Sequence, residues 1–153
     1  MPAIIAKDRF VALAGSDLGA SDWFLIDQER VDEFADVTID HQFIHVDPVK
    51  AAATPFGGTI AHGFLTVALL VHLMKDISVV PQGAVMGINY GFDKVRFLTP
   101  VKVGSRIRAT ARVADVAEKS PGQFLVTYDV TVEIEGEAKP ALVARWLGMT
   151  VVA

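Results

Sequence analysis

One long apolar segment, followed by four extended segments, constrains the fold more than any other feature of the sequence. Residues 60–75 would place apolar side chains around nearly the whole circumference of a helix, which is typical of a helix buried on all sides. Four valine-rich segments follow it and span residues 85–98, 105–117, 123–135 and 141–152. Turn-forming residues separate these segments at Gly104, Ser120-Pro121-Gly122 and Gly136. Strands at this spacing predict one antiparallel sheet.

The second extended segment alternates between polar and apolar side chains. Such alternation puts one set of side chains on each face of a sheet. The polar set consists of Arg106, Arg108, Thr110 and Arg112, and the apolar set of Ile107, Ala109, Ala111 and Val113. We therefore expect an α+β fold, in which a long antiparallel sheet curls around one central buried helix.

The first half of the chain is predicted to carry shorter helices. Asp27 can cap a helix over residues 28–37, where apolar residues recur at helical spacing. Asp47-Pro48 is a second helix start, with one or two turns over residues 49–53. Because the chain contains no internal repeat, low-complexity tract or linker, residues 1–153 are expected to form a single domain.

Composition narrows the possible functions. The chain is 52% hydrophobic and 21% charged, which suits a globular protein with a large core. Its formal net charge of −4 argues against a nucleic-acid partner, because phosphate binding needs clustered positive charge. The sequence has no cysteine, which rules out disulfides and thiolate metal sites and is consistent with the cytosol.

The apolar segments give no sign of a membrane or secretory role. The first residues lack a basic leader followed by a long apolar run, so we expect no secretory signal. The longest apolar stretch, residues 63–74, is shorter than the roughly 20 residues that span a bilayer. A protein without a membrane partner, located in the cytoplasm, is the expectation.

The segment from Thr38 to Pro48 holds the most polar chemistry in the sequence. Asp40 and His45 lie five residues apart in a connection between predicted helices, where their side chains can converge on one small molecule. A carboxylate and an imidazole together can orient a water molecule and remove its proton. The alternative is structural, since an aspartate before a helix is more often a cap. A metal site is a weaker interpretation, because only His41 lies nearby and no further histidine or cysteine cluster completes it.

A glycine-rich approach to the central helix forms the second candidate feature. It runs from Gly57 to Gly63. The first amides of a helix lack internal partners and carry the positive end of the helix dipole, and glycine lets a ligand oxygen approach them closely. The Gly63 amide could therefore stabilise an enolate-like oxygen. The equally weighted alternative is that Gly63 only permits tight packing of the helix against the sheet.

Taken together, these motifs resemble the MaoC-like dehydratases, also called (R)-specific enoyl-CoA hydratases. The likeness spans nearly the whole chain and is greatest to the branch of nodulation-protein-N-like proteins and mycobacterial 3-hydroxyacyl-thioester dehydratases. The residues that carry it are Asp40 to Pro48, Pro55 to Phe64, Ile88 to Phe97 and Pro100 to Gly104.

The resemblance implies a fold, a reaction and a set of site residues. The fold would be the hot-dog fold, and the reaction the reversible hydration of a trans-2-enoyl thioester to the (R)-3-hydroxyacyl thioester. Asp40 and His45 match the catalytic pair of the family, and Gly63 the glycine that binds the thioester carbonyl. No cofactor is expected, because the alkene of the thioester is already electrophilic at C3. Family members usually form homodimers, so a homodimer is expected here.

Two positions depart from better-known members of the family. Gln42 replaces a common asparagine, so it is expected to support the pair through a longer arm. Val71 replaces a serine that some members carry two turns into the central helix, which removes one polar group near the water. The basic residues available for the phosphates of CoA, none of which is assigned, are Lys94, Arg96, Lys102, Arg106 and Arg108.

Two other functions compete with hydration. A hot-dog thioesterase would hydrolyse the same class of thioester, although such enzymes more often use a carboxylate without the histidine. A non-catalytic acyl-thioester-binding module would bind acyl-CoA tightly without turnover.

Overall fold

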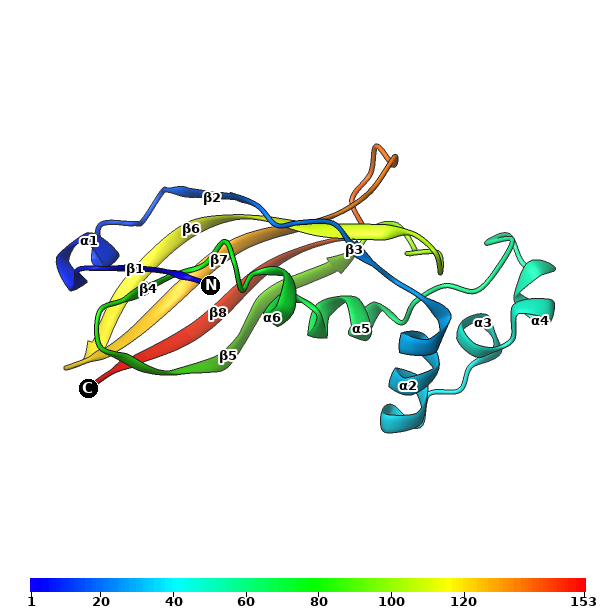
Figure 1. Cartoon of the computed structure of the whole chain (residues 1–153), viewed down its shortest axis with the longest axis horizontal. Helices are drawn as coiled ribbons and strands as arrows, with labels where there is room; N and C mark the ends of the chain where they lie inside the picture. Colours follow the sequence, from blue (N-terminus) through cyan, green and yellow to red (C-terminus); the bar gives the residue numbers. More distant parts are fainter.

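The computed structural model describes all 153 residues, from Met1 to Ala153. Its main feature is a long, twisted, antiparallel sheet (Figure 1). From one edge to the other, the strands are β2 (Asp17–Ala20), β6 (Arg106–Ser120), β7 (Gln123–Ile134), β8 (Leu142–Val152) and β5 (Ala84–Phe97). A short strand, β3 (Phe24–Leu25), also pairs with β6. The four long strands lie within three residues of the predicted segments, which confirms the antiparallel sheet and the α+β class.

The alternation predicted along β6 is confirmed. Ile107, Ala109 and Val113 are buried in the core, whereas the arginines between them are exposed or half-buried. Fully burying an isoleucine or valine contributes roughly 1.5–3 kcal/mol relative to leaving it in water, so this register is strongly favoured. The β6–β7 and β7–β8 connections also match the turn residues. At the β6–β7 turn, a Cβ on Gly122 would lie 2.8 Å from the carbonyl oxygen of Val152, and only glycine avoids that contact.

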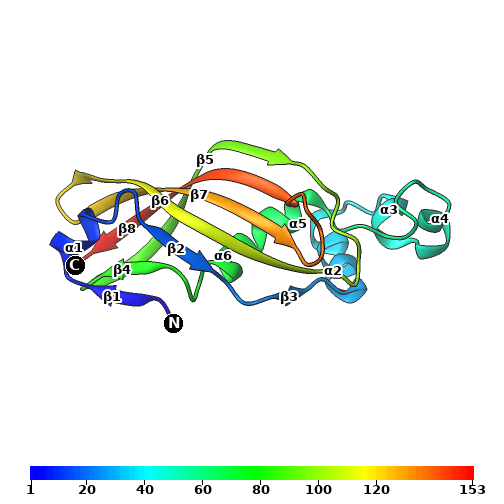
Figure 2. The same ribbon diagram turned by 90° about the horizontal axis from the view of Figure 1, so that it is seen from above.

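The central helix differs from its prediction in length and in burial. It is divided into α5 (Gly63–Ala68) and α6 (Leu70–Leu73), which lie along one face of the sheet (Figures 1 and 2). The predicted start at residue 60 was wrong, because the residues from Ile60 to the start of α5 are extended. Ile60 forms an isolated bridge with Lys102, and the Ala61 amide donates to the Val101 carbonyl at 2.8 Å.

The prediction that this helix is buried on all sides was also wrong for the single chain. Leu65, Leu70 and Leu73 enter the core, but Phe64 is 72% exposed and Val71 is 56% exposed. These two residues are seven positions apart, so they lie on one side of the helical segment, away from the sheet. The helix therefore has one apolar face that its own sheet does not cover.

Three helices gather beyond one end of the sheet (Figure 1). They are α2 (Gln28–Thr38), α3 (Phe43–Val46) and α4 (Pro48–Ala52). The first and last confirm the predicted helices and their caps: Asp27 accepts a hydrogen bond from the Arg30 amide, and Asp47 from the Lys50 amide. The short helix α3 was not predicted, because that segment was interpreted as a loop.

The opposite end of the sheet carries elements that the sequence did not predict. Strand β1 (Ala3–Ile5) pairs in parallel with β4 (Val79–Pro81), and α1 (Lys7–Val11) follows β1. Phe10 of α1 is buried against Phe124 of β7, with the two rings 5.8 Å apart in an edge-to-face arrangement. None of the helices is both long enough and apolar enough to cross a membrane.

Candidate active site

Asp40 is placed by an unusual helix end. Ile39 ends α2 in the left-handed region, with φ of 61°, and it is the one non-glycine residue with positive φ. For an L-amino acid this conformation costs roughly 1–2 kcal/mol. It reverses the chain, so the amides of both Ile39 and Asp40 donate to the carbonyl of Ala35. The backbone of Asp40 is thus fixed at a sharp turn.

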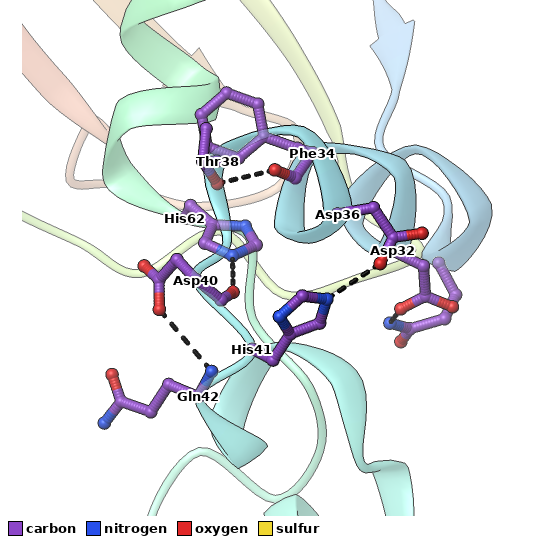
Figure 3. A network of polar contacts seen from close by, with 9 residues as sticks. Asp32, Phe34, Asp36, Thr38, Asp40, His41, Gln42 and His62 are labelled. Carbon is purple, nitrogen blue, oxygen red and sulfur yellow. Dashed lines mark hydrogen bonds and ion pairs between the residues drawn. The ribbon is translucent and has the colours of Figure 1, made fainter.

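The carboxylate of Asp40 remains almost unengaged. It accepts one long hydrogen bond, 3.4 Å, from the backbone amide of Gln42 (Figure 3). The side chain of Gln42 is exposed and makes no hydrogen bond to Asp40. Gln42 therefore contacts the carboxylate through its backbone.

His45 lies on α3, where sequence interpretation placed a loop, and its ring is held from one side. The residue is 7% exposed, and its Nδ1 lies 2.7 Å from the carbonyl oxygen of Ile60. A carbonyl oxygen only accepts, so Nδ1 carries the proton in the neutral ring. The other nitrogen, Nε2, is then an acceptor that can receive a proton from water.

Burial sets the protonation of this imidazole. It lowers the pKa of His45 below 6.5, the ordinary value for histidine. The hydrogen bond to Ile60 raises the pKa, His62 lowers it, and Asp40 raises it, and together these effects are too weak to restore the ordinary value. At neutral pH the ring is therefore predominantly neutral, the state in which it can accept a proton.

Two residues from other elements support His45. Gln28 of α2 donates from Nε2 to the His45 carbonyl at 2.7 Å. Thr59 donates from its hydroxyl to Gln28 Oε1 at 2.6 Å. The first turn of α2 and the segment before α5 are thus both tied to α3.

His62, the residue before α5, completes the cluster. Its Nε2 lies 2.9 Å from the carbonyl oxygen of Asp40 (Figure 3), and its ring stacks on the His45 ring with centroids 3.8 Å apart. The donor atoms of Asp40, His45 and His62 all lie within 4.8 Å of one another, a spacing that could hold a metal ion. Each ring donates one N–H to a backbone carbonyl and keeps one unprotonated nitrogen, and the two rings are stacked at an interplanar angle of 26° rather than aimed at one point. The arrangement suits proton transfer better than metal coordination.

Gly63 opens α5, so its amide has no acceptor within the helix. A Cβ at Gly63 would lie 2.8 Å from the Phe97 ring. The glycine permits the close approach of this ring, and its amide is also free, so both interpretations of this residue have structural support.

An open pocket of about 410 Å³ is lined by His45 and Gly63, whereas Asp40 and His62 do not line it. It is mostly apolar, which suits an acyl chain, and it is lined by residues that include His45, Gly63, Phe64, Thr66, Phe97 and Val101. A larger depression, of about 960 Å³, lies over the charged face of the sheet and contains none of the predicted site residues.

Other polar residues noted in the sequence have structural partners elsewhere. His41 pairs with Asp36 at 2.7 Å on the surface, which directs it away from the cluster (Figure 3). Among the basic residues, Arg108 pairs with Glu133 at 2.7 Å and Arg106 with Glu135 at 3.5 Å. These two arginines neutralise neighbouring glutamates on the sheet.

Comparison with known proteins places the chain in a family. The MaoC like domain matches residues 9–135. The chain belongs to the MaoC-like family. It is 55% identical over 134 residues to 3-hydroxyacyl-thioester dehydratase Z from Mycobacterium tuberculosis (strain ATCC 25618 / H37Rv). The aligned residues cover 88% of each chain. It is 51% identical over 141 residues to nodulation protein N from Rhizobium meliloti (strain 1021), which covers 90% of this chain and 86% of that protein.

Solved structures confirm the hot-dog fold of this MaoC-like chain. An R-hydratase from Pseudomonas aeruginosa in its unliganded form superposes with a TM-score of 0.67 at 25% identity, covering 92% of this chain and 83% of that one.

Sequence reasoning missed three residues of this MaoC-like site. His62 stood inside the glycine-rich motif without a role, and Gln28 and Thr59 carried no signal of their own. A signal for His62 was present: it is a polar residue between apolar neighbours directly before Gly63. The hydrogen-bond partners of Gln28 and Thr59 lie 17 and 31 residues away in the chain, so neither pairing can be read from local spacing.

Proposed function

We propose that this chain is an (R)-specific 3-hydroxyacyl-thioester dehydratase that also runs in reverse, as an enoyl-thioester hydratase. The observation that carries the proposal is an almost unengaged carboxylate, on Asp40, close to an unprotonated imidazole nitrogen, on His45, which itself lines an apolar pocket. The names of its relatives, 3-hydroxyacyl-thioester dehydratase and R-hydratase, describe the same chemistry.

In the hydration direction, one water molecule binds between Asp40 and His45. Asp40 is the principal base, and His45 orients the water through Nε2 and shares its proton. The water oxygen forms a bond to C3 of the enoyl thioester, the alkene electrons move toward the carbonyl, and the enolate-like oxygen is stabilised by the Gly63 amide. C2 then takes the proton from the pair on the same face. Water is added, nothing is oxidised, and the reverse sequence is dehydration.

The supporting parts of the site have defined tasks in this proposal. The pocket lined by Phe64, Phe97 and Val101 binds the acyl chain. Gln42 supports Asp40 through its backbone amide. Losing one hydrogen-bond donor to a developing oxyanion typically lowers the rate by about 10²–10³-fold.

The homodimer is part of the proposal. Strand β5 lies at one edge of the sheet and pairs with β8 alone, and its apolar side chains are exposed, including Val85, Ile88 and Tyr90. The uncovered face of the helical segment, with Phe64 and Val71, is a second exposed apolar surface. A second copy of the chain would cover both.

The experiment is hydration of crotonyl-CoA, followed by loss of the enoyl absorbance, with two matched pairs of variants. Asp40→Asn and His45→Asn remove the two proton-accepting groups with little change in volume, and each should lower kcat by about 10²–10⁴-fold. Asp47→Asn and His41→Asn make the same chemical changes in the same segment, outside the site, and should keep kcat near the wild-type value.

Three outcomes would contradict the proposal. Equal, slow hydration by the wild type and both site variants would show that the site assignment is wrong. Release of free thiol without loss of the alkene would indicate a thioesterase. Tight binding without turnover for enoyl-CoAs of four to sixteen carbons would indicate a binding module.

A further inference from the structure

His62 is the most completely buried polar residue near the site. It is 2% exposed, and it contacts both members of the Asp40–His45 pair. Its Nε2–H donates to the Asp40 carbonyl at 2.9 Å (Figure 3), while its ring lies against the His45 ring at an interplanar angle of 26°. It has no direct role in the mechanism above.

We propose that His62 is a positioning residue, which fixes the Asp40 carboxylate and the His45 ring relative to each other and to Gly63. This inference rests on the proposed function. It assigns His62 no contact with substrate.

The hydrogen bond from His62 is the first part of the argument. Asp40 follows a left-handed residue at the end of α2, and its side chain accepts one long hydrogen bond. The backbone of Asp40 is therefore held by two hydrogen bonds, one from its own amide to Ala35 and one from His62 to its carbonyl. Without the second bond, only the helix end would fix the direction of the carboxylate.

The connectivity of His62 is the second part. The residue immediately precedes Gly63, and Ala61 before it is tied to the sheet through Val101. One rigid stretch of chain thus carries the amide proposed to bind the thioester and the ring that holds the base. A thioester bound at Gly63 is therefore presented to Asp40 at a fixed distance.

The stacked ring is the third part. Phe34 of α2 also contacts the His62 ring, with centroids 5.0 Å apart, so the imidazole is confined between α2 and α3. The Nδ1 atom of His62 is buried and has no hydrogen-bond partner. A buried polar atom without a partner is costly, and its retention beside the pair suggests a task other than packing.

His62 also influences the charge state of its neighbour. Besides burial and the hydrogen bond to Ile60, the groups that affect the pKa of His45 are His62, which lowers it, and Asp40, which raises it. Gln28, which contacts the His45 backbone, is uncharged. Replacing His62 with a neutral residue should therefore raise the pKa of His45.

Two substitutions separate the hydrogen bond from the charge. His62→Phe keeps a flat ring for stacking and loses the donor, whereas His62→Gln keeps a donor near the position of Nε2 and loses the ring. His62→Phe should lower kcat by about 10²-fold with little change in KM, since a misplaced base costs roughly that much. His62→Gln should recover about tenfold or more of this loss. In both variants the acidic limb of kcat/KM should move to higher pH, because the effect of His62 that lowers the pKa of His45 is removed.

His72→Gln is the matched control, because His72 lies exposed on α6, outside the site. It should leave both kcat and the acidic limb unchanged. Equal losses of kcat in the two His62 variants, with an unmoved acidic limb, would show that His62 only fills space and would overturn the inference. Wild-type kcat in both variants would overturn it too. If His62→Phe does not fold, the pH of the acidic limb in His62→Gln is the test of the inference.

Histidine NMR titration separates this inference from the proposed function, because it needs no substrate. The pKa of His45 is measured in the wild type and in His62→Gln, with His45→Asn to assign the signal. A higher pKa of His45 in His62→Gln, with no turnover by the wild type, would contradict the proposed function and leave the positioning role intact. Turnover by the wild type, with an unmoved pKa of His45 and equal losses of kcat in His62→Phe and His62→Gln, would overturn the positioning role and leave the proposed function intact.

Discussion

Two aspartates of one short segment, Asp40 and Asp47, have different chemical roles because their carboxylates have different partners. The Asp47 carboxylate accepts hydrogen bonds at the start of α4, and its contacts with Lys50 hold its pKa below the usual range. The Asp40 carboxylate has one weak partner and lies beside two imidazoles. A carboxylate that already accepts several hydrogen bonds is a poor base. The segment therefore has one structural aspartate and one that is free to react.

The lowered pKa of His45 predicts a pH dependence for activity. The neutral ring accepts the proton of water, so activity falls as pH drops through the pKa of His45. Since burial lowers that pKa, the acidic limb of kcat/KM should lie below pH 6.5. A pH–rate profile with crotonyl-CoA measures it, and a limb at or above 6.5 would contradict the neutral, buried ring.

The free energy of unfolding should also depend on pH through His45. In the unfolded chain His45 titrates near 6.5, so the unfolded state binds a proton more readily than the folded state as pH falls below this value. The contribution of His45 to the free energy of unfolding is therefore neutral above pH 6.5 and destabilising below it. Asp129 has the same direction at lower pH: Arg145 holds its pKa low, so its contribution to stability is present above its ordinary pKa of 3.8 and is lost as pH falls below that value.

At the scale of elements, the sequence predicted the sheet better than the central helix. The strands were recognisable because their alternation and turn residues are local signals, as in β6 and at Gly122. The start of α5 was not, because its position depends on hydrogen bonds to residues about 40 positions later, in the segment around Val101. Asp40, His45 and Gly63 were proposed as site residues from sequence. Their geometry was not, since the short helix α3 and the left-handed Ile39 have no distinct pattern.

The contact between α5 and the end of β5 gives a prediction about Gly63. Gly63→Ala would place a Cβ 2.8 Å from the half-exposed Phe97 ring, which can swing outward toward solvent. The free energy of unfolding should then change by only about 1 kcal/mol, within the range of mild overpacking. Because the Cβ also crowds the approach to the amide, kcat/KM should fall by about 10²-fold. Urea unfolding and crotonyl-CoA kinetics measure the two quantities.

The double variant Gly63→Ala/Phe97→Ala decides which effect matters. It relieves the clash with the ring but keeps the methyl group beside the amide. Activity that stays low in the double variant supports an amide that binds the thioester. Activity restored to the level of Phe97→Ala alone would instead assign Gly63 a packing role.

At the scale of the whole molecule, β5 has features that a solitary edge strand would avoid. It is 14 residues long, and apolar side chains are exposed on both of its faces. Natural proteins usually protect such edges with charges, prolines or short strands, because unpaired backbone groups invite pairing with another chain. The charged residues of β5, Asp93, Lys94 and Arg96, are confined to its second half.

The proposed homodimer predicts the effect of charge at this edge. Ile88 and Tyr90 are 46% and 64% exposed in the single chain, and in a pair of joined sheets they would lie at or near the interface. Ile88→Lys/Tyr90→Lys should convert a dimer into a monomer at micromolar concentration, measured by light scattering. Ile4→Lys on β1, also an exposed isoleucine, is the matched control and should leave the dimer intact. A wild-type chain that is monomeric under these conditions, or a double variant that stays dimeric, would show that β5 is not the interface. If the dimer is lost, kcat should fall as well, because the exposed Phe64 beside the pocket then loses its cover.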